Sequence, residues 1–269
     1  MNLVIGSTSQ LAHYFPEDYV RMSSRETDWG YLRENNWESV YITFAEQRIY
    51  DRDVDYITPN YLMTMSAINA ALESANKIVC YTSCELWNDL SGHISADIKP
   101  KFYPLDNEYT ISKLLLWNKV VEKRKFNSLY NKVIFVHPFY FNSVYRNKYF
   151  LFGKIFDSII KKQRIDVGSL DFYRDMVHAS FVVKKSIEAT SDCMIGSGKL
   201  FHARTFIKDL YQLNNMDFDE YVKENVSVLP TGKEKLIMAK VPWEYAYEDL
   251  LSDTQTELEQ FMTMEKQWI

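Results

Sequence analysis

The chain has 269 residues, of which 46% are hydrophobic and 25% are charged, and its formal net charge is −5 at pH 7. These proportions are ordinary for a globular protein with a sizeable core, so they exclude disorder as the main state. Nucleic-acid-binding proteins normally carry a basic excess, and this chain has none, so we expect no nucleic-acid partner.

Cysteine usage and the apolar runs indicate the compartment. The three cysteines form no CxxC pair and the five histidines are scattered, so we expect no metal site and a reducing, cytoplasmic environment. No apolar run approaches the roughly 18 residues that a membrane helix needs, and the first residues lack the basic region of a signal peptide. We therefore expect no association with a membrane.

The first half of the chain alternates strand-like and helical patterns. An apolar run over Leu3–Ile5, ended by Gly6, predicts a strand that is followed by a helix-like stretch from Gln10. Further strands are predicted over Tyr19–Met22, Ser39–Phe44, Lys77–Tyr81 and Lys132–Val136, and helices over Asn60–Ala75 and Tyr109–Arg124. Short apolar strands alternating with helices predict an α/β fold with a parallel sheet.

The pattern changes after about residue 142. Helical stretches over Phe150–Gln163, Val177–Thr190 and Thr205–Leu213 alternate with short irregular segments. We therefore expect a smaller C-terminal lobe, interleaved with the sheet domain, over residues 143–269.

The turn after the first strand is the first of three motifs that bear on chemistry. In a dinucleotide-binding fold, small residues at this turn let backbone N–H groups and a helix N-terminus face a pyrophosphate. Gly6 holds the first glycine position, whereas Ser9 and Ala12 stand at the second and third, in a chain with only 8 glycines. Alone, this pattern fits an ordinary strand–helix turn equally well.

The second motif is the pair Tyr109 and Lys113, whose spacing of four places both side chains on one face of a helix. A nearby ammonium stabilises the phenolate, which makes tyrosine usable as an acid or base near neutral pH. The third motif is Ser83 with Glu85, directly after a predicted strand, where ligands of parallel sheets bind. Alone, each also fits a structural role: a solvated pair for Tyr109 and Lys113, and a helix cap for Ser83.

These three motifs stand in the order of the extended short-chain dehydrogenase/reductase family. The chain resembles the nucleotide-sugar epimerase/dehydratase branch of that family, and the GDP-mannose 4,6-dehydratases in particular. The similarity runs weakly to about residue 240. The matching segments are Gly6–Phe15, Val40–Gln47, Tyr81–Trp87, Phe141–Asn142, Gly168–Asp171 and Arg174–His178.

The resemblance implies a Rossmann-like, doubly wound parallel sheet over residues 1–142, which binds NAD(P), and a smaller sugar-nucleotide-binding lobe. Only 14 residues (26–39) separate Arg25 from Val40. The family normally fits a helix, a third strand and an adenine-contacting acidic residue there, so we expect a shortened cofactor domain.

The resemblance also implies roles for individual residues. Tyr109 would exchange a proton with the C4 oxygen of a sugar, Lys113 would lower the Tyr109 pKa and hold the nicotinamide ribose, and Ser83 would orient the same oxygen. Glu85 would remove the C5 proton in a dehydratase. The implied cofactor-binding residues are Gly6, Thr8, Ser9, Gln10, Ser24, Arg25 and Ala45. The implied substrate-binding residues are Asn142, Lys154 and Arg174, which would hold a nucleotide diphosphate.

The implied function is NAD(P)-dependent chemistry at C4 of a nucleotide-activated sugar. A trimmed cofactor pocket favours reduction of a 4-keto deoxysugar nucleotide, whereas Glu85 favours a 4,6-dehydratase. An epimerase is a further alternative, since epimerases of this branch often carry a glutamate at this position without that role. Ser24 and Arg25 stand where the family holds the 2′-phosphate of NADP, so we expect NADP(H) ahead of NAD(H). A non-catalytic sugar-nucleotide or dinucleotide sensor is the alternative of a different class.

Relatives in this family often pair through the helix that carries the tyrosine and lysine. The apolar run Leu114–Trp117 could form such an interface, so we expect a homodimer. A buried core face explains the same run equally well.

Overall fold

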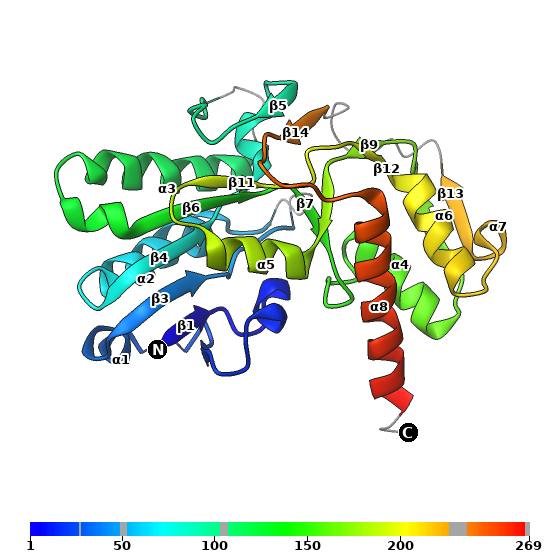
Figure 1. Cartoon of the computed structure of the whole chain (residues 1–269), viewed down its shortest axis with the longest axis horizontal. Coiled ribbons are helices and arrows are strands. Elements are labelled where there is room, and N and C mark those ends of the chain that lie inside the picture. Colours follow the sequence, from blue (N-terminus) through cyan, green and yellow to red (C-terminus); the bar gives the residue numbers. More distant parts are fainter. Residues whose placement is uncertain (27, 49–52, 103–106, 226–235, 267–269) are drawn as a thin grey trace. The chain divides into compact units, whose positions relative to one another are not determined.

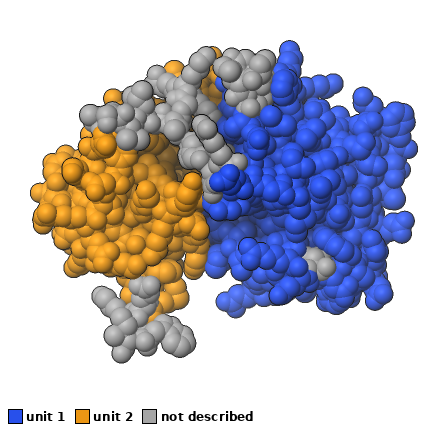
Figure 2. All heavy atoms as spheres, turned by 180° about the vertical axis from the view of Figure 1, so that it is seen from behind, with its two compact units in different colours: residues 1–89, 95–138, 182–195 blue, residues 90–94, 139–181, 196–269 orange. Residues whose placement is uncertain are grey.

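A computed structural model describes residues 1–26, 28–48, 53–102, 107–225 and 236–266. The chain divides into two compact units, drawn in blue and orange in Figure 2. Unit 1 comprises residues 1–89, 95–138 and 182–195, and unit 2 comprises residues 90–94, 139–181 and 196–269.

Unit 1 is built on a six-stranded sheet in the order β11-β6-β4-β3-β1-β2, in which every neighbouring pair is parallel (Figure 1). Its strands are β1 (Asn2–Ile5), β2 (Val20–Met22), β3 (Trp37–Ile42), β4 (Ala75–Tyr81), β6 (Val133–Pro138) and β11 (Cys193–Ile195). The parallel sheet confirms the predicted α/β, Rossmann-like class.

The helices of unit 1 connect these strands. They are the 3-10 helices η1 (Gln10–Tyr14), η3 (Cys84–Trp87) and η4 (Ser128–Lys132), the π-helix η2 (Thr58–Met63), and α1 (Trp29–Glu34), α2 (Thr64–Ala71), α3 (Glu108–Arg124) and α5 (Ala179–Glu188), which begins in unit 2. The predicted helix over Asn60–Ala75 ends early, at Ala71, because Ala75 already pairs in β4. The helix expected after Gln10 is only a five-residue 3-10 helix, because Pro16 follows directly.

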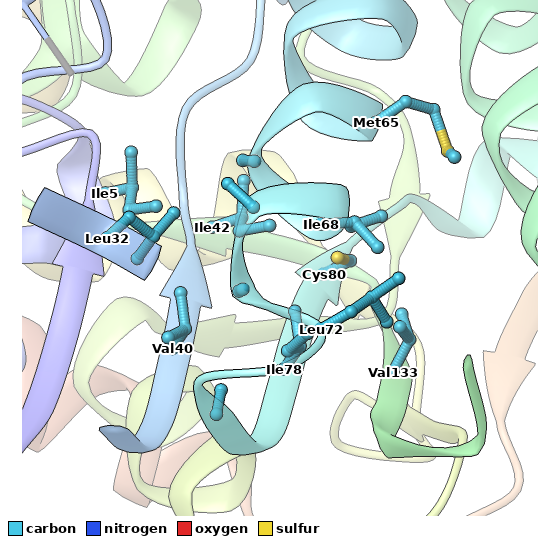
Figure 3. Packing of buried hydrophobic residues seen from close by; sticks show 14 of the residues in the cluster. Ile5, Leu32, Val40, Ile42, Met65, Ile68, Leu72, Ile78, Cys80 and Val133 are labelled. Carbon is cyan, nitrogen blue, oxygen red and sulfur yellow. The ribbon is translucent and has the colours of Figure 1, made fainter. Parts of the chain in front are cut away.

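One face of the sheet carries the main core of unit 1. Alternate residues of the strands, such as Ile5, Ile42 and Ile78, pack against α2 and α3 (Figure 3). Leu114 and Leu116 are both buried, whereas Leu115 is 42% exposed. The core explanation therefore accounts for Leu114 and Leu116 of the run that was considered as a dimer interface.

Aromatic side chains cover part of the opposite face. The ring of Tyr41 in β3 packs against Phe15 and Tyr19, with centroids 4.7 and 5.9 Å away. Beside it, Lys77 in β4 donates hydrogen bonds to the carbonyls of Ile187 and Ala189 at the end of α5. The aromatic residues that follow η1 thus occupy sheet surface that a longer first helix would otherwise cover.

The sheet ends at β2. The connection from β2 to β3 contains only the six-residue α1, and in the described part of the chain no strand pairs with the outer edge of β2. The guanidinium of Arg21 donates hydrogen bonds to four carbonyls of the preceding loop, those of Phe15, Pro16, Glu17 and Tyr19. This short connection agrees with the 14-residue interval in the sequence; that the cofactor domain is shortened stays a prediction.

Unit 2 consists of short strands and helices. Its strands are β5 (Gly92–Ile94), β7 (Tyr140–Asn142), β8 (Ile165–Gly168), β9 (Tyr173–Arg174), β10 (Met176–His178), β12 (Phe201–His202), β13 (Val222–Asn225) and β14 (Ile237–Ala239). Its other helices are α4 (Leu151–Lys161), α6 (Ala203–Leu213), α7 (Phe218–Tyr221) and α8 (Tyr247–Lys266). The strands pair two by two: β7 with β10, β8 with β13 and β5 with β14 in parallel, and β9 with β12 antiparallel. The helix predicted from Val177 begins only at Ala179, because Met176–His178 pairs with β7.

Asp175 holds several segments of unit 2 together. Its buried carboxylate accepts hydrogen bonds from the backbone N–H groups of Ser197, Gly198 and Ala239 and from the Ser197 hydroxyl. Within the described ranges, no helix is both long and apolar enough to cross a bilayer.

Candidate active site

The Gly6 turn keeps a conformation that requires glycine. Gly6 has φ +105°, and an added Cβ would lie 2.8 Å from the Phe44 nitrogen and 2.9 Å from Thr43 Oγ1. The N–H groups of Gly6 and Ser7 both donate to the Met22 carbonyl, at 2.8 and 3.2 Å. The turn is therefore fixed between the ends of β3 and β2, at the carboxyl edge of the sheet.

Ser9 closes the turn through its own side chain. Its hydroxyl donates to Thr43 Oγ1 at 2.7 Å and accepts from the N–H of Ala12 at 3.3 Å. Thr8 is exposed beside it, and Gln10 opens η1. Because η1 is a single short helix, its N-terminus lacks the axial dipole with which a longer helix binds a pyrophosphate.

Three other predicted cofactor residues follow the neighbouring strands. Ser24 and the exposed Arg25 come shortly after β2, and Ala45 comes shortly after β3. Because β1, β2 and β3 are parallel, these residues lie at the same edge of the sheet as Gly6.

The segment after β4 places Ser83 and Glu85 at this edge. Ser83 is the N-cap of η3, and its hydroxyl accepts a hydrogen bond from the N–H of Glu85 at 3.2 Å. Glu85 itself is 7% exposed. A carboxyl group therefore lies buried two residues from the candidate catalytic hydroxyl.

Helix α3 brings Tyr109 and Lys113 to the end of β4. Asn107 caps the helix by accepting the N–H of Thr110 at 2.9 Å, which fixes the first turn where Tyr109 lies. One turn later, Lys113 Nζ donates to the carbonyl of Tyr81, the last residue of β4, at 3.0 Å. The predicted tyrosine–lysine pair thus stands beside the strand end that leads into Ser83.

Among the described residues, no carboxylate neutralises the positive charge of Lys113. The residue is 2% exposed, and burial lowers its pKa to about 8. In the part of the chain that the structure describes, no carboxylate lies within 4.0 Å of its ammonium, and Tyr81 accepts only one of its three N–H groups. Buried ammonium groups normally have full hydrogen bonding, so two donors remain for a ligand.

Sequence reasoning missed Asn60, which connects helix α3 to the segment that follows β3. Its wholly buried amide accepts the N–H of Glu46 at 2.8 Å and donates to the Glu46 carbonyl at 3.0 Å and to Ser112 Oγ at 3.1 Å. The Ser112 hydroxyl donates in turn to the Tyr109 carbonyl at 2.7 Å. The available signal was an asparagine at helical spacing from the buried positions Thr64 and Ala67.

His137 was also missed, because it lies inside an apolar strand. It is 1% exposed on β6, and Nδ1 contacts the hydroxyl of Thr82, the residue before Ser83. Burial lowers the pKa of His137 to about 4, so the imidazole is neutral at physiological pH. The pair joins the carboxyl ends of β4 and β6 at the residue before Ser83.

Within unit 2, Arg174 is a buried cation without a counter-ion. It is 7% exposed, stacks 5.1 Å from the Tyr140 ring and 5.0 Å from the Phe172 ring, and donates to the Tyr173 carbonyl at 2.7 Å. Among the described residues, no carboxylate forms an ion pair with it. In particular, Asp175 is engaged elsewhere. An uncompensated buried guanidinium is suited to an anionic ligand.

The two other predicted substrate residues differ in setting. Asn142, the last residue of β7, is 1% exposed, and its Nδ2 has no hydrogen-bond partner. Lys154 is exposed on α4, so its ammonium lies in solvent. No group of three His, Cys, Asp or Glu side chains in the described ranges is arranged to bind a metal ion.

No family model matches the chain, and no curated protein matches its sequence. Solved structures match its fold along almost the whole length. The dTDP-glucose 4,6-dehydratase of Bacillus anthracis in complex with NAD has a TM-score of 0.74 at 13% identity, covering 97% of this chain and 97% of that chain. The UDP-N-acetylglucosamine 4-epimerase of Methanobrevibacter ruminantium has a TM-score of 0.76 at 11% identity, covering 98% of each chain.

A third match is the protein RMD of Pseudomonas aeruginosa complexed with NADPH, with a TM-score of 0.74 at 12% identity, covering 96% of this chain and 99% of that chain. At such identities the likeness establishes the fold. The chain therefore has the fold of nucleotide-sugar dehydratases and epimerases, as its sequence motifs predicted.

Proposed function

We propose that the chain is an enzyme of the extended short-chain dehydrogenase/reductase family, which uses a nicotinamide dinucleotide to change C4 of a nucleotide-activated sugar. The observation that carries this proposal is the buried pair Tyr109 and Lys113 beside the half-buried Ser83 at the carboxyl end of β4, with an ammonium that no carboxylate among the described residues neutralises. A structural lysine would not be expected to remain so poorly paired.

The residues present fit part of a dinucleotide. The Gly6 turn, which packs closely against Thr43 and Phe44, lies at the carboxyl edge of the sheet, and Lys113 offers two N–H donors for ribose hydroxyls. Against this, the short η1 and the sheet ending at β2 offer little for the adenine half. When bound, the dinucleotide would supply or accept the hydride at C4. Arg25, exposed after β2, supports NADP(H) ahead of NAD(H) through its guanidinium.

The side chains of this protein would manage the proton and the orientation of the sugar. Tyr109 would give a proton to the C4 oxygen or take one from it, and the Lys113 ammonium would stabilise the phenolate form. The Ser83 hydroxyl would hydrogen-bond the same oxygen and hold it in line with Tyr109. Arg174, with Asn142, would bind the diphosphate of the substrate, whereas Lys154 could add only a solvent-exposed charge.

Two kinds of reaction remain, namely reduction of a 4-keto sugar, and dehydration or epimerisation. A separate observation favours each kind. The shortened adenine side favours a 4-keto reductase, because a reductase exchanges its dinucleotide at every turnover. Buried Glu85, two residues from Ser83, favours a dehydratase or epimerase, as do the names of the solved neighbours. A reductase would oxidise NADPH only when a 4-keto nucleotide sugar is supplied. A dehydratase would form a keto sugar from an unmodified nucleotide sugar without net cofactor consumption.

The test compares Tyr109→Phe with Tyr130→Phe on a panel of UDP-, GDP- and dTDP-sugars, each with both dinucleotides. Tyr130 is as buried as Tyr109, but its hydroxyl donates to Asn69 Oδ1 at 2.5 Å, so it controls for loss of a buried hydroxyl. We expect at least about 100-fold slower turnover for Tyr109→Phe only, the scale of general acid–base catalysis. Equal turnover in both variants would refute the role of Tyr109, and a wild-type protein that binds a sugar nucleotide or dinucleotide without turnover would favour the non-catalytic sensor.

A further inference from the structure

Helix α8 buries polar residues where an amphipathic helix normally buries apolar ones. The positions turned inward along it include Leu250, Thr254, Glu257 and Leu258, of which Thr254 is fully buried and Glu257 is 9% exposed. Buried polar groups are costly unless they are paired. The partners of Thr254 and Glu257 therefore indicate what this face of the helix holds.

Glu257 fixes the ends of β7 and β10. Its Oε2 accepts the N–H of Val144 at 2.8 Å and lies 3.0 Å from His178 Nε2. The N–H of Ser180 donates to His178 Nδ1 at 3.3 Å, so the imidazole proton is on Nε2 and points at the carboxylate. One carboxylate thereby holds the last residue of β10 and the loop that follows β7.

Thr254 holds Asn142, which is the register partner of His178 across the β7–β10 pair. Its hydroxyl lies 2.7 Å from the Leu250 carbonyl and 3.4 Å from Asn142 Oδ1, so one proton is shared between two oxygens. This contact with Oδ1 fixes the orientation of the Asn142 amide. The amide nitrogen is left without an acceptor.

Two consecutive residues at this strand end have unsatisfied buried atoms. Asn142 Nδ2 and Ser143 Oγ have no hydrogen-bond partner, although the residues are 1% and 0% exposed. Each unpaired buried group costs about 1–3 kcal/mol. Because both groups are unpaired in the ligand-free protein, they are suited to a ligand that supplies acceptor atoms.

The charge nearby favours an anionic acceptor. Tyr140 and Asn142 point to the same face of β7, because side chains alternate along a strand, about 7 Å apart. The Arg174 guanidinium lies over the Tyr140 ring at 5.1 Å. An uncompensated cation therefore lies over the side chain that precedes Asn142 on the same face of β7.

We propose that Asn142 and Ser143 together bind phosphoryl oxygens of the substrate's diphosphate, and that Thr254 and Glu257 of α8 are positioning residues that fix them for it. This deepens the proposed function and rests on it. Ser143 becomes a further ligand, and the C-terminal helix becomes part of the binding apparatus without touching the substrate.

The experiment measures binding of UDP, GDP and dTDP by calorimetry, with thermal denaturation of the same samples. Thr254→Val is compared with Thr263→Val, since Thr263 lies on the same helix and donates to the Glu259 carbonyl in the same way, but is exposed and has no Asn142 beside it. We expect several-fold weaker binding for Thr254→Val, unchanged binding for Thr263→Val, and recovery in Thr254→Ser.

Ser143→Ala separates a ligand from a structural residue. Because its hydroxyl has no partner, removal should leave the melting temperature unchanged or higher while weakening diphosphate binding about 10-fold. Glu257→Gln keeps an acceptor for the Val144 N–H and should weaken binding less than Glu257→Ala.

The outcomes distinguish the two proposals. If wild-type protein binds a diphosphate and both Ser143→Ala and Thr254→Val bind it equally well, this inference is wrong and the proposed function stands. If wild-type protein binds none of the three diphosphates, the proposed function is overturned and this inference with it.

Discussion

Replacing Lys113 with methionine should stabilise the folded protein while removing its chemistry. The ammonium is buried, donates one hydrogen bond, and has a pKa of about 8 against an ordinary 10.5. Each unit of pKa corresponds to about 1.4 kcal/mol. Folding with a charged Lys113 therefore costs about 3 kcal/mol at pH 7, and an uncharged side chain of similar length should recover most of that amount.

The destabilisation that the charged Lys113 causes should depend on pH within a defined range. Because the pKa of Lys113 is lower in the folded than in the unfolded chain, the unfolded chain binds more protons between about pH 8 and pH 10.5. The free energy of unfolding of the wild type should therefore rise with pH in that window, and the cost should be full and constant below it. Lys113→Met should lack this rise.

Urea denaturation at pH 7, 8, 9 and 10, followed by tryptophan fluorescence, measures the difference. Lys119→Met is the matched control on the same helix, since Lys119 is 41% exposed and pairs with Glu122 at 2.9 Å. We expect Lys113→Met to exceed the wild type by about 2–3 kcal/mol at pH 7, and the gap to narrow above pH 8. A Lys113→Met protein less stable than the wild type at pH 7 would refute the reasoning, because the charge would then be compensated within the fold.

Two further predictions concern the frame of unit 1. Asn60→Ala should lower the free energy of unfolding by about 2–4 kcal/mol, because it removes the partners of the Glu46 N–H and carbonyl and the hydrogen bond that Ser112 Oγ accepts; an unchanged denaturation midpoint would contradict this. Asp192→Asn should cost about 1–3 kcal/mol, because Asp192 receives both terminal nitrogens of Arg124 at 2.7 and 2.8 Å. Thermal melting at low and high salt checks the second prediction, and a salt-insensitive loss would argue against a role for charge.

Local signals were sufficient to predict five strands of the sheet of unit 1, whereas the edge strand β11 was missed. Apolar runs such as Leu3–Ile5 and Lys77–Tyr81 correspond to strands that are buried on both faces, so composition alone identifies them. The short interval after Arg25 likewise predicted that no further strand lies between β2 and β3, because 14 residues cannot hold a helix and another strand.

In unit 2, local sequence patterns were not sufficient, because contacts between segments far apart in the sequence determine the structure. Met176–His178 has a helical neighbourhood, yet it pairs with β7 over 30 residues away. The buried settings of Arg174 and Asn142 depend on partners that no local pattern reveals. Asn60 and His137 were missed for a related reason, since a polar residue inside an apolar run is visible in the sequence, but its partners are not.

The ending of the sheet at β2 has a consequence for self-association. An outermost strand presents unpaired backbone groups on which a second chain can add a strand. Here β2 is only three residues long, and its central residue is the arginine whose guanidinium binds four carbonyls of the adjoining loop. A short edge with a charge at its centre discourages edge-to-edge pairing. The sheet therefore ends in an exposed edge at β2 that is poorly suited to pair with a second chain.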